Sequence, residues 1–402
     1  MHPLLHFSLL EANMSDSRKV RKIHFYIVAI VTAFFSIFSA VVMTEPGQSL
    51  NLPRSWTVAY YHYSEYFIAL NMALLAYLWY LHTKAKLWTN RRMRWASKGV
   101  LVCIISANFL LSLLFPPRQT DAIYMTVAQA NNQLRKEEII YAVEINGDVR
   151  GFPRSHLGIP HIAGDTIGGE EVAMTFCGLS NLPVVIDQDI GHGEKADLGI
   201  LIQTHNNLVM VERNSGDLIQ QITMETEFSE SDIKQYPNTM MTWEAFKEIY
   251  PDAEVFIYPF DRWMDKLLVK AFDKPMEKQF DPERGAIFPT LDMADERLNA
   301  KEQVWGLNSD GKQIAFTHEF AKQNPVYEFE MAGKPYVLVY SEEYDIVNLF
   351  SLEKEGLRVT FGEINFKGET DSEWGRLEQV PTQNGIFWMV WSHWFPETKL
   401  MS

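Results

Sequence analysis

The sequence predicts an α+β protein with three N-terminal transmembrane helices, followed by a β-rich exported region made of two tandem related units. Three long, nearly uncharged runs stand near the start of the 402-residue chain, and the remainder alternates between apolar and polar residues like a soluble domain. Self-comparison of that remainder reveals an internal repeat. The predicted boundaries are 1–22 (cytoplasmic N-terminus), 23–117 (three-helix transmembrane region), 118–136 (helical connector), 137–257 (first β-rich unit), 258–301 (connector) and 302–402 (second β-rich unit).

The three apolar runs extend from Ile23 to Met43, from Ala59 to Leu81 and from Gly99 to Phe115. Each is close to the ~20 residues that cross the hydrocarbon core of a bilayer. Lys and Arg gather before the first run and between the second and the third, which places these segments on the cytoplasmic side. We therefore expect three spans in lipid, a bacterial inner-membrane location, a cytoplasmic N-terminus and a periplasmic C-terminal region.

Charge divides the chain in the same way. Residues 1–120 hold 12 Lys and Arg against 4 Asp and Glu, whereas the whole chain has a net charge of −15. The part after residue 120 is therefore strongly acidic. Because nucleic-acid binding depends on the release of cations from phosphates by Lys and Arg, this composition argues against a nucleic-acid partner and leaves a protein partner possible.

The internal repeat begins with two hairpins. The stretch from Glu138 to Phe152 matches the stretch from Gln303 to Phe316, and each turns at Asn-Gly or Asp-Gly, residues that accept the positive φ of a two-residue turn. The similarity continues at 167–176 and 331–340. Further along, 242–251 matches 387–396, each an apolar helix followed by proline. The exported region is therefore expected to contain two copies of one β-rich fold.

Cys177 is the first candidate for chemistry. It ends a predicted strand, and the other cysteine, Cys103, lies in the third apolar run, so no disulfide is expected within the exported region. His161 precedes the strand of Cys177, and His205 follows another strand. A thiolate with two imidazoles suits copper or zinc. Alternatively, a histidine could lower the pKa of Cys177 and make it a nucleophile or a redox thiol.

Asp165 could orient one of these imidazoles or join them as a ligand. The repeat restricts such chemistry to the first unit. In the second unit Ser341 occupies the position that corresponds to Cys177, and no histidine occupies the positions that correspond to His161 and His205. A buried, inert cysteine that packs as a small apolar residue is the alternative reading of Cys177.

The same stretch resembles the bacterial envelope proteins grouped as domain of unknown function 3179. The resemblance covers residues 137–400, and the residues that carry it are His161, Asp165, Gly168, Gly169, Phe176, Cys177, His205, Asn207, Ser215, Gln220 or Gln221, and 243–251. Ser180 replaces the second cysteine of the C-x-x-C pattern found in that family, so one thiol remains and a local dithiol cycle is excluded. The resemblance implies no established activity or substrate.

Three functions follow as hypotheses. The first is metal binding, with copper or zinc, or redox handling by His161, Cys177 and His205. The second is a Cys–His enzyme of unidentified substrate. The third is a non-catalytic scaffold or accessory subunit of a membrane complex, favoured by Ser180 and by the second unit, which lacks the candidate residues.

Overall fold

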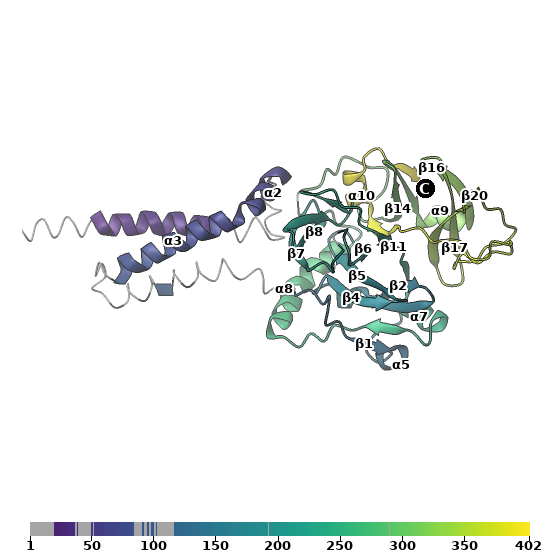
Figure 1. Cartoon of the computed structure of the whole chain (residues 1–402), viewed down its shortest axis with the longest axis horizontal. Helices are drawn as coiled ribbons and strands as arrows, with labels where there is room; N and C mark the ends of the chain where they lie inside the picture. Colours follow the sequence, from purple (N-terminus) through teal and green to yellow (C-terminus); the bar gives the residue numbers. More distant parts are fainter. Residues whose placement is uncertain are drawn as a thin grey trace, which may run out of the picture. The chain divides into compact units, whose positions relative to one another are not determined.

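The computed structural model describes residues 20–36, 38, 50, 52–83, 91, 95, 98, 99, 102, 116–191, 193–288 and 290–402. The chain forms two compact units, Met1–Leu114 and Phe115–Ser402. The N-terminal unit is helical, and the C-terminal unit is β-rich (Figure 1). The architecture is therefore α+β, as the sequence predicts.

The N-terminal unit contains a helix over residues 20–36, α2 (Arg54–His62) and α3 (Ser64–Thr83). Phe25 of the first helix packs with Leu75, Leu78 and Leu81 of α3 in a small apolar core. A buried hydrogen bond from Asn71 Nδ2 to Ser36 Oγ, 2.7 Å long, joins the same two helices.

The prediction of three transmembrane helices is wrong for the part of the chain that the structure describes. No helix there is both long enough and apolar enough to span a bilayer. The predicted second span is broken at Tyr63 between α2 and α3, and Glu65, Asn71 and His82 reduce the hydropathy of α3. Most of the predicted third span, and the first beyond residue 38, lie outside the described residues. Bilayer contact, an inner-membrane location, a cytoplasmic N-terminus and a periplasmic C-terminal region were all inferred from these spans. These expectations are withdrawn with the spans.

The β-rich unit begins with a five-stranded sheet in the order β1-β13-β3-β2-β12. β2 and β3 form the predicted hairpin, β12 adds antiparallel to β2, and β13 adds parallel to β3. Four- and three-stranded sheets follow in the orders β11-β6-β5-β4, β10-β9-β8-β7, β21-β14-β15-β22 and β16-β17-β18. Two short strands, β19 and β20, pair with each other.

The bounds of the strands in the first part of the unit are β1 (Tyr124–Thr126), β2 (Ile139–Ile145), β3 (Asp148–Pro153), β4 (Ile162–Ile167), β5 (Glu170–Cys177), β6 (Leu182–Asp187), β7 (Leu198–Thr204), β8 (Asn207–Glu212), β9 (Asp217–Gln220), β10 (Glu225–Thr226), β11 (Gln235–Tyr236), β12 (Thr239–Thr242) and β13 (Glu254–Phe256). Those of the second part are β14 (Gln303–Ser309), β15 (Lys312–Thr317), β16 (Val326–Met331), β17 (Lys334–Ser341), β18 (Ile346–Ser351), β19 (Glu353–Lys354), β20 (Leu357–Arg358), β21 (Gln383–Phe387) and β22 (Lys399–Met401). The helices are α5 (Val127–Ala130), α6 (Arg154–Leu157), α7 (Trp243–Ile249), α8 (Trp263–Phe280), α9 (His318–Gln323) and α10 (Trp388–Trp394).

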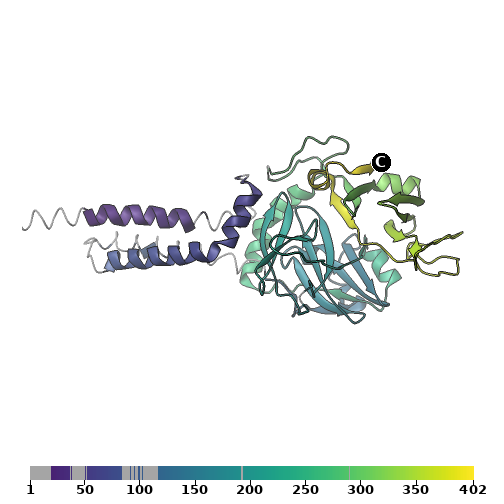
Figure 2. The ribbon, with the colours of Figure 1, turned by 45° about the horizontal axis from the view of Figure 1, so that its top comes forward.

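The strand order of the first part recurs in the second. The hairpin β14-β15 takes β21 antiparallel on one side and β22 parallel on the other, as β2-β3 takes β12 and β13. β16-β17-β18 likewise repeats β4-β5-β6. We call residues 118–257 the first half and residues 302–402 the second half; they lie side by side in Figures 1 and 2. The finer predicted boundaries stay a prediction.

Turn chemistry explains why both copies form these hairpins. Asn146 and Asp310 have φ values of 51° and 49°, and the glycine after each also has a positive φ, as a two-residue hairpin turn requires. The matching helices end alike. Tyr250 is the C-cap of α7 and Phe395 the C-cap of α10, and in both cases proline comes next and cannot continue the helix.

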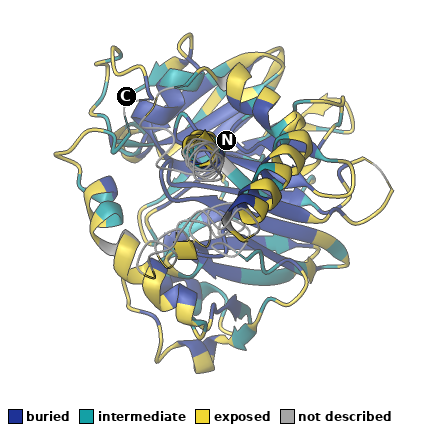
Figure 3. Ribbon diagram, turned by 90° about the vertical axis from the view of Figure 1, so that its left-hand side faces the viewer, coloured by how far each residue is buried: buried dark blue, intermediate teal, exposed yellow. Residues whose placement is uncertain are grey.

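Both halves contribute to one apolar core. Its buried residues include Ile162, Leu182 and Leu208 of the first half and Trp388 and Trp391 of the second. Figure 3 shows many strand residues of the β-rich unit in dark blue, which marks them as buried, whereas exposed residues in yellow are frequent on helices and loops. Because the halves share this core, burial of apolar area stabilises them together.

The stretch between the halves is more ordered than a plain connector. It contains α8, whose last carbonyls, of Lys278 and Gln279, accept hydrogen bonds from the buried ammonium of Lys301 at 3.1 and 2.5 Å. Carbonyls at a helix C-terminus have no partner within the helix, and a cation there also complements the helix dipole. Lys301 therefore fixes the end of α8.

Candidate functional site

Cys177 lies at the end of β5, opposite Leu182 of β6, and is fully buried. Its thiol, with one proton to donate, has two acceptors within reach: Oε1 of Gln203 at 3.7 Å and the carbonyl of Asn206 at 3.6 Å. Gln203 belongs to β7, and Asn206 lies in the turn between β7 and β8. Cys177 therefore links the sheet of β5 to the hairpin β7-β8 through the proton of its thiol.

His161 comes directly before β4 and has a φ of 54°. Its ring is buried, and Nδ1 lies 2.9 Å from the carbonyl of Phe176, so the neutral tautomer with the proton on Nδ1 donates there. The backbone N–H of Phe176 donates in return to the carbonyl of His161 at 2.8 Å. The predicted proximity of His161 to the end of β5 is thus present, through Phe176, the neighbour of Cys177.

Burial lowers the pKa of His161 to about 4, and the hydrogen bond to Phe176 only partly opposes this shift. At neutral pH the imidazole is therefore uncharged. An uncharged ring offers no positive charge to stabilise a thiolate.

His205 occupies the first position of the turn between β7 and β8, with a φ of 50°. Its ring stacks on that of His393, at 4.9 Å between centroids, and meets the edge of Trp394. Its carbonyl accepts a hydrogen bond from Nε1 of Trp394 at 3.2 Å. His205 therefore contributes to the contact between the halves, where α10 packs against the turn.

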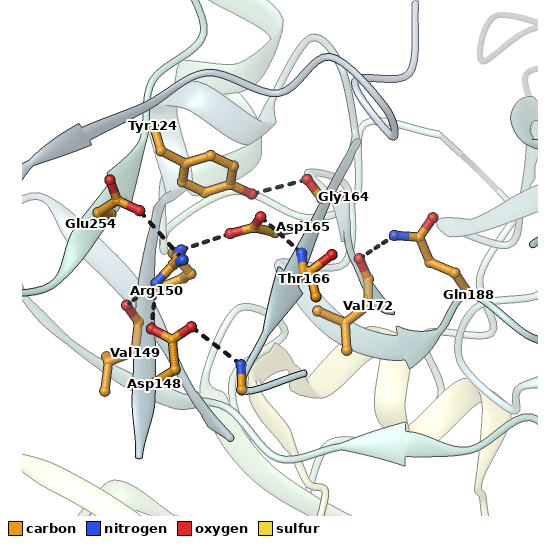
Figure 4. A network of polar contacts seen from close by, with 11 residues as sticks. Tyr124, Asp148, Val149, Arg150, Gly164, Asp165, Thr166, Val172, Gln188 and Glu254 are labelled. Carbon is orange, nitrogen blue, oxygen red and sulfur yellow. Dashed lines mark hydrogen bonds and ion pairs between the residues drawn. The ribbon is translucent and has the colours of Figure 1, made fainter. Parts of the chain in front are cut away.

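Asp165, expected beside a histidine, faces Arg150 of β3 instead (Figure 4). Oδ2 accepts from Nε of Arg150 at 2.6 Å, and Oδ1 accepts from the N–H of Thr166 at 2.8 Å. Asp148 and Glu254 also pair with Arg150, at 2.6 and 3.3 Å. The carboxylate of Asp165 is thus part of a structural ion-pair network between strands.

The four predicted site residues therefore do not form a ligand set in the contacts given above. Across the described part of the chain, no three His, Cys, Asp or Glu side chains gather in a group that could hold a metal ion. The geometry of these residues therefore does not support the expected copper or zinc centre at His161, Cys177 and His205, with Asp165 as an additional residue.

The polar residues that do meet at this place are amides. Nε2 of Gln221 donates to Oγ1 of Thr175 at 2.9 Å and to the carbonyl of Leu182, and so joins the chain after β9 to β5 and β6. Nδ2 of Asn207 donates to Oε1 of Gln220 at 2.8 Å. Gln203 and Asn206, which contact the thiol of Cys177, are buried as well, so several buried amide residues lie around the end of β5. The sequence feature that could have indicated these buried contacts is the presence of Asn and Gln within or beside otherwise apolar strands.

Comparison with known families now identifies the chain. The family described as "Protein of unknown function (DUF3179)" matches residues 117–398. The chain belongs to this family. No curated protein and no solved structure matches it. The match covers the β-rich unit from its first residues through β21 and α10, up to the residue before β22, and carries no statement about a membrane or the cell envelope.

In this DUF3179 protein, Ser180 stands where the second cysteine of C-x-x-C was expected. It is buried, and its hydroxyl donates to the carbonyl of Cys177 at 3.4 Å. Asn181 follows with a φ of 55°, and its Nδ2 donates to the carbonyl of Gly385 in the second half at 2.7 Å. The turn after Cys177 is therefore used for joining the halves.

Proposed function

We propose that this protein is a non-catalytic binding protein, in which Cys177 is a structural thiol and the two halves form one rigid recognition unit. The hydrogen bonding of the thiol supports this best. Cys177 is fully buried, and the single proton of its thiol lies between two acceptors, Oε1 of Gln203 and the carbonyl of Asn206. The backbone carbonyl can only accept, so it favours the protonated thiol.

A thiol enzyme and a metal centre both need the thiolate. Loss of the proton from Cys177 would place a negative sulfur beside two oxygen acceptors without a solvent shell to compensate. His161 is neutral at physiological pH and would not offset this cost. The arrangement thus favours a structural cysteine, which packs in the core and donates a hydrogen bond, over a nucleophilic or metal-binding cysteine.

The test is the reactivity of Cys177 in the purified full-length chain carrying Cys103→Ser, so that a single cysteine remains. Alkylation by iodoacetamide is followed at pH 6, 7 and 8, with and without urea. We expect the folded protein to react at least ~100-fold more slowly than the unfolded chain, because alkylation requires both exposure and the thiolate.

An exposed cysteine supplies the matched control. Glu230→Cys in a Cys103→Ser, Cys177→Ala background places a thiol on an exposed loop and should react equally fast with and without urea. If folded Cys177 instead reacts at pH 6 faster than this control, the thiol is activated and the proposal of a non-catalytic protein is overturned.

A further inference from the structure

A cleft with a volume of about 290 Å³ lies where the two halves meet. β6, β11 and the chain between β9 and β11 line it from the first half. β14, Tyr336 of β17 and residues 380–383 line it from the second half. Apart from Asp232 and Lys234, the side chains that line it are uncharged, and Lys234 is paired with Glu170 at 3.2 Å.

The cleft arises because the chain before β21 changes sheets. Gln379 bridges to Phe350 of β18, and the N–H of Val380 donates to the carbonyl of Leu349 at 2.9 Å. After Pro381 and Thr382 the chain reaches β14, where Gln383 pairs with Gly306. β14 itself continues to Ser309, paired with β15 alone over its last three residues.

The exposed edge of β14 therefore carries main-chain groups that face the cleft. Ser309 and Lys312 flank a two-residue turn and form the last pair of the hairpin. Because hydrogen bonds to one neighbour alternate along an antiparallel strand, the N–H and C=O of Asn308 point away from β15. Pro381, the residue nearest in register, has no N–H, and the described backbone hydrogen bonds include none between Asn308 and either Pro381 or Thr382.

The first half contains the same change of sheet with a different outcome. β11 pairs with β6, and after Pro237 the chain pairs with β2 as β12. β2 also continues past its partner, and Glu144 takes the position that corresponds to Asn308. There the carboxylate of Glu144 pairs with Arg376 of the second half and accepts a hydrogen bond from Tyr250 at 3.2 Å. The two equivalent positions thus differ, because a side chain of the second half contacts Glu144 whereas Asn308 borders a cleft.

Gln383 also lines the cleft, and its side chain is fixed there. Its Nε2 donates to the carbonyl of Ile222 at 2.6 Å, so this wall of the cleft is held between the two halves.

From these observations we propose that the cleft binds an extended, uncharged segment of a partner protein, which adds as a strand to β14 at Leu307–Ser309. Main-chain hydrogen bonds to Asn308 supply the affinity, as in other cases of β-strand addition. This inference rests on the proposed binding function and names its site and its class of ligand.

The test uses peptides of 12 random residues displayed on phage and selected on the immobilised full-length protein. The best peptide is then synthesised, and its affinity is measured by calorimetry. Asn308→Pro removes the main-chain donor at a strand position whose N–H has no β15 partner, whereas Asn308→Ala keeps the donor and removes only the side chain. We expect Asn308→Pro to weaken binding about tenfold or more, as for loss of one good hydrogen bond, and Asn308→Ala to change it less than about threefold.

A second arm does not depend on the folding of Asn308→Pro. N-methylation of alternate peptide residues should abolish binding at one parity and leave it intact at the other, because only every second N–H faces β14. Equal binding by both Asn308 variants with no parity effect, or failure to select any peptide with a Kd below 1 mM, would overturn the proposal. So would self-association of the protein that Asn308→Pro abolishes, since the edge would then serve a second copy. Cys177→Ala should bind the peptide normally, so this test fails or succeeds independently of the thiol experiment.

Discussion

Nε of Arg150 donates to Oδ2 of Asp165 at 2.6 Å, across the gap between β3 and β4 (Figure 4). The guanidinium also contacts Asp148 and Glu254 and lies 5.8 Å from the centre of the Tyr124 ring. Asp165 is one of the residues on which the family resemblance was based. Its ion pair with Arg150 gives this aspartate a structural role that involves no catalysis. The relationship makes Arg150 the first residue to test.

Replacing Arg150 with Met should destabilise the β-rich unit by about 2 kcal/mol, because three carboxylates would lose their shared cation. This destabilisation is smaller than that expected for loss of one partner of a fully buried ion pair, because the side chain of Glu254 is 46% exposed. The free energy of unfolding is measured by urea titration. Arg358→Met serves as the control, since Arg358 and Glu328 are both about half exposed, and it should cost less than about 1 kcal/mol. Equal losses in the two variants would show that the Arg150 network adds no stability.

His161 should make the protein sensitive to acid. Its pKa is about 4 in the folded chain, against about 6.5 when unfolded. Between these values the unfolded state binds a proton that the folded state does not, so stability falls as pH decreases from 6.5 to 4. The loss at pH 4 is about 3 kcal/mol, and this contribution is fully present above pH 6.5.

His161→Asn isolates this effect. Asn tolerates the positive φ, and its amide can donate to the carbonyl of Phe176, but it does not titrate. Unfolding by urea is measured from pH 7 to pH 4 for both proteins. Protonation of the other titratable groups changes the stability of both proteins equally. Between pH 7 and pH 4 the free energy of unfolding should therefore fall by about 3 kcal/mol more in the wild type than in the variant. Parallel pH profiles would mean that His161 is not held neutral by burial.

Gly306 should not tolerate a side chain. A Cβ at this position of β14 would lie 2.3 Å from the ring of Trp391, and a buried indole has little room to move. Gly306→Ala should therefore destabilise the protein by about 3 kcal/mol through overpacking. Gly285→Ala, at a glycine where no atom lies within 4 Å of the place that the methyl group would take, should change stability by less than about 0.5 kcal/mol. Urea titration of the two variants measures the difference.

Lys301→Met should loosen the end of α8. The variant keeps the aliphatic stem but removes the donor to the carbonyls of Lys278 and Gln279. Amide hydrogen exchange in the last turn of α8 should speed up about tenfold, as expected for loss of about 1.4 kcal/mol of local protection. Lys270→Met, on the exposed side of α8, is the control and should leave exchange there unchanged. If the amide hydrogens of this turn exchange at the same rate in both variants, the hydrogen bonds of Lys301 do not stabilise the end of α8.

The hairpins and the repeat could be predicted because their signals are local. Asn146-Gly147 and Asp310-Gly311 specify a two-residue turn by conformational preference alone, and the structure places both at hairpin turns. The helices before Pro251 and Pro396 are likewise defined by neighbouring residues. The spans were predicted wrongly because apolar runs were read without their interruptions, such as the break at Tyr63.

The site could be predicted only in part, because its contacts depend on register between distant strands. The proximity of His161 to the end of β5 follows from one hairpin, since Ile162 pairs with Thr175. The choice of Gln203 and Asn206 as partners of Cys177 depends on how β7-β8 lies against β5, which no local pattern encodes. The pairing of Asp165 with Arg150 has the same origin, because the two residues stand on different sheets.

The parallel pairs that complete the two halves have a consequence for how the chain folds. Residue 150 pairs with residue 254, and residue 314 with residue 399, so each half is closed by a strand made long after its partner. Contacts so distant in sequence slow folding, since a large loop must be closed before the pairing stabilises it. During synthesis the edges of β3 and β15 remain exposed until those late strands emerge. A nascent chain of this kind is vulnerable to aggregation and is expected to depend on chaperones that protect strand edges.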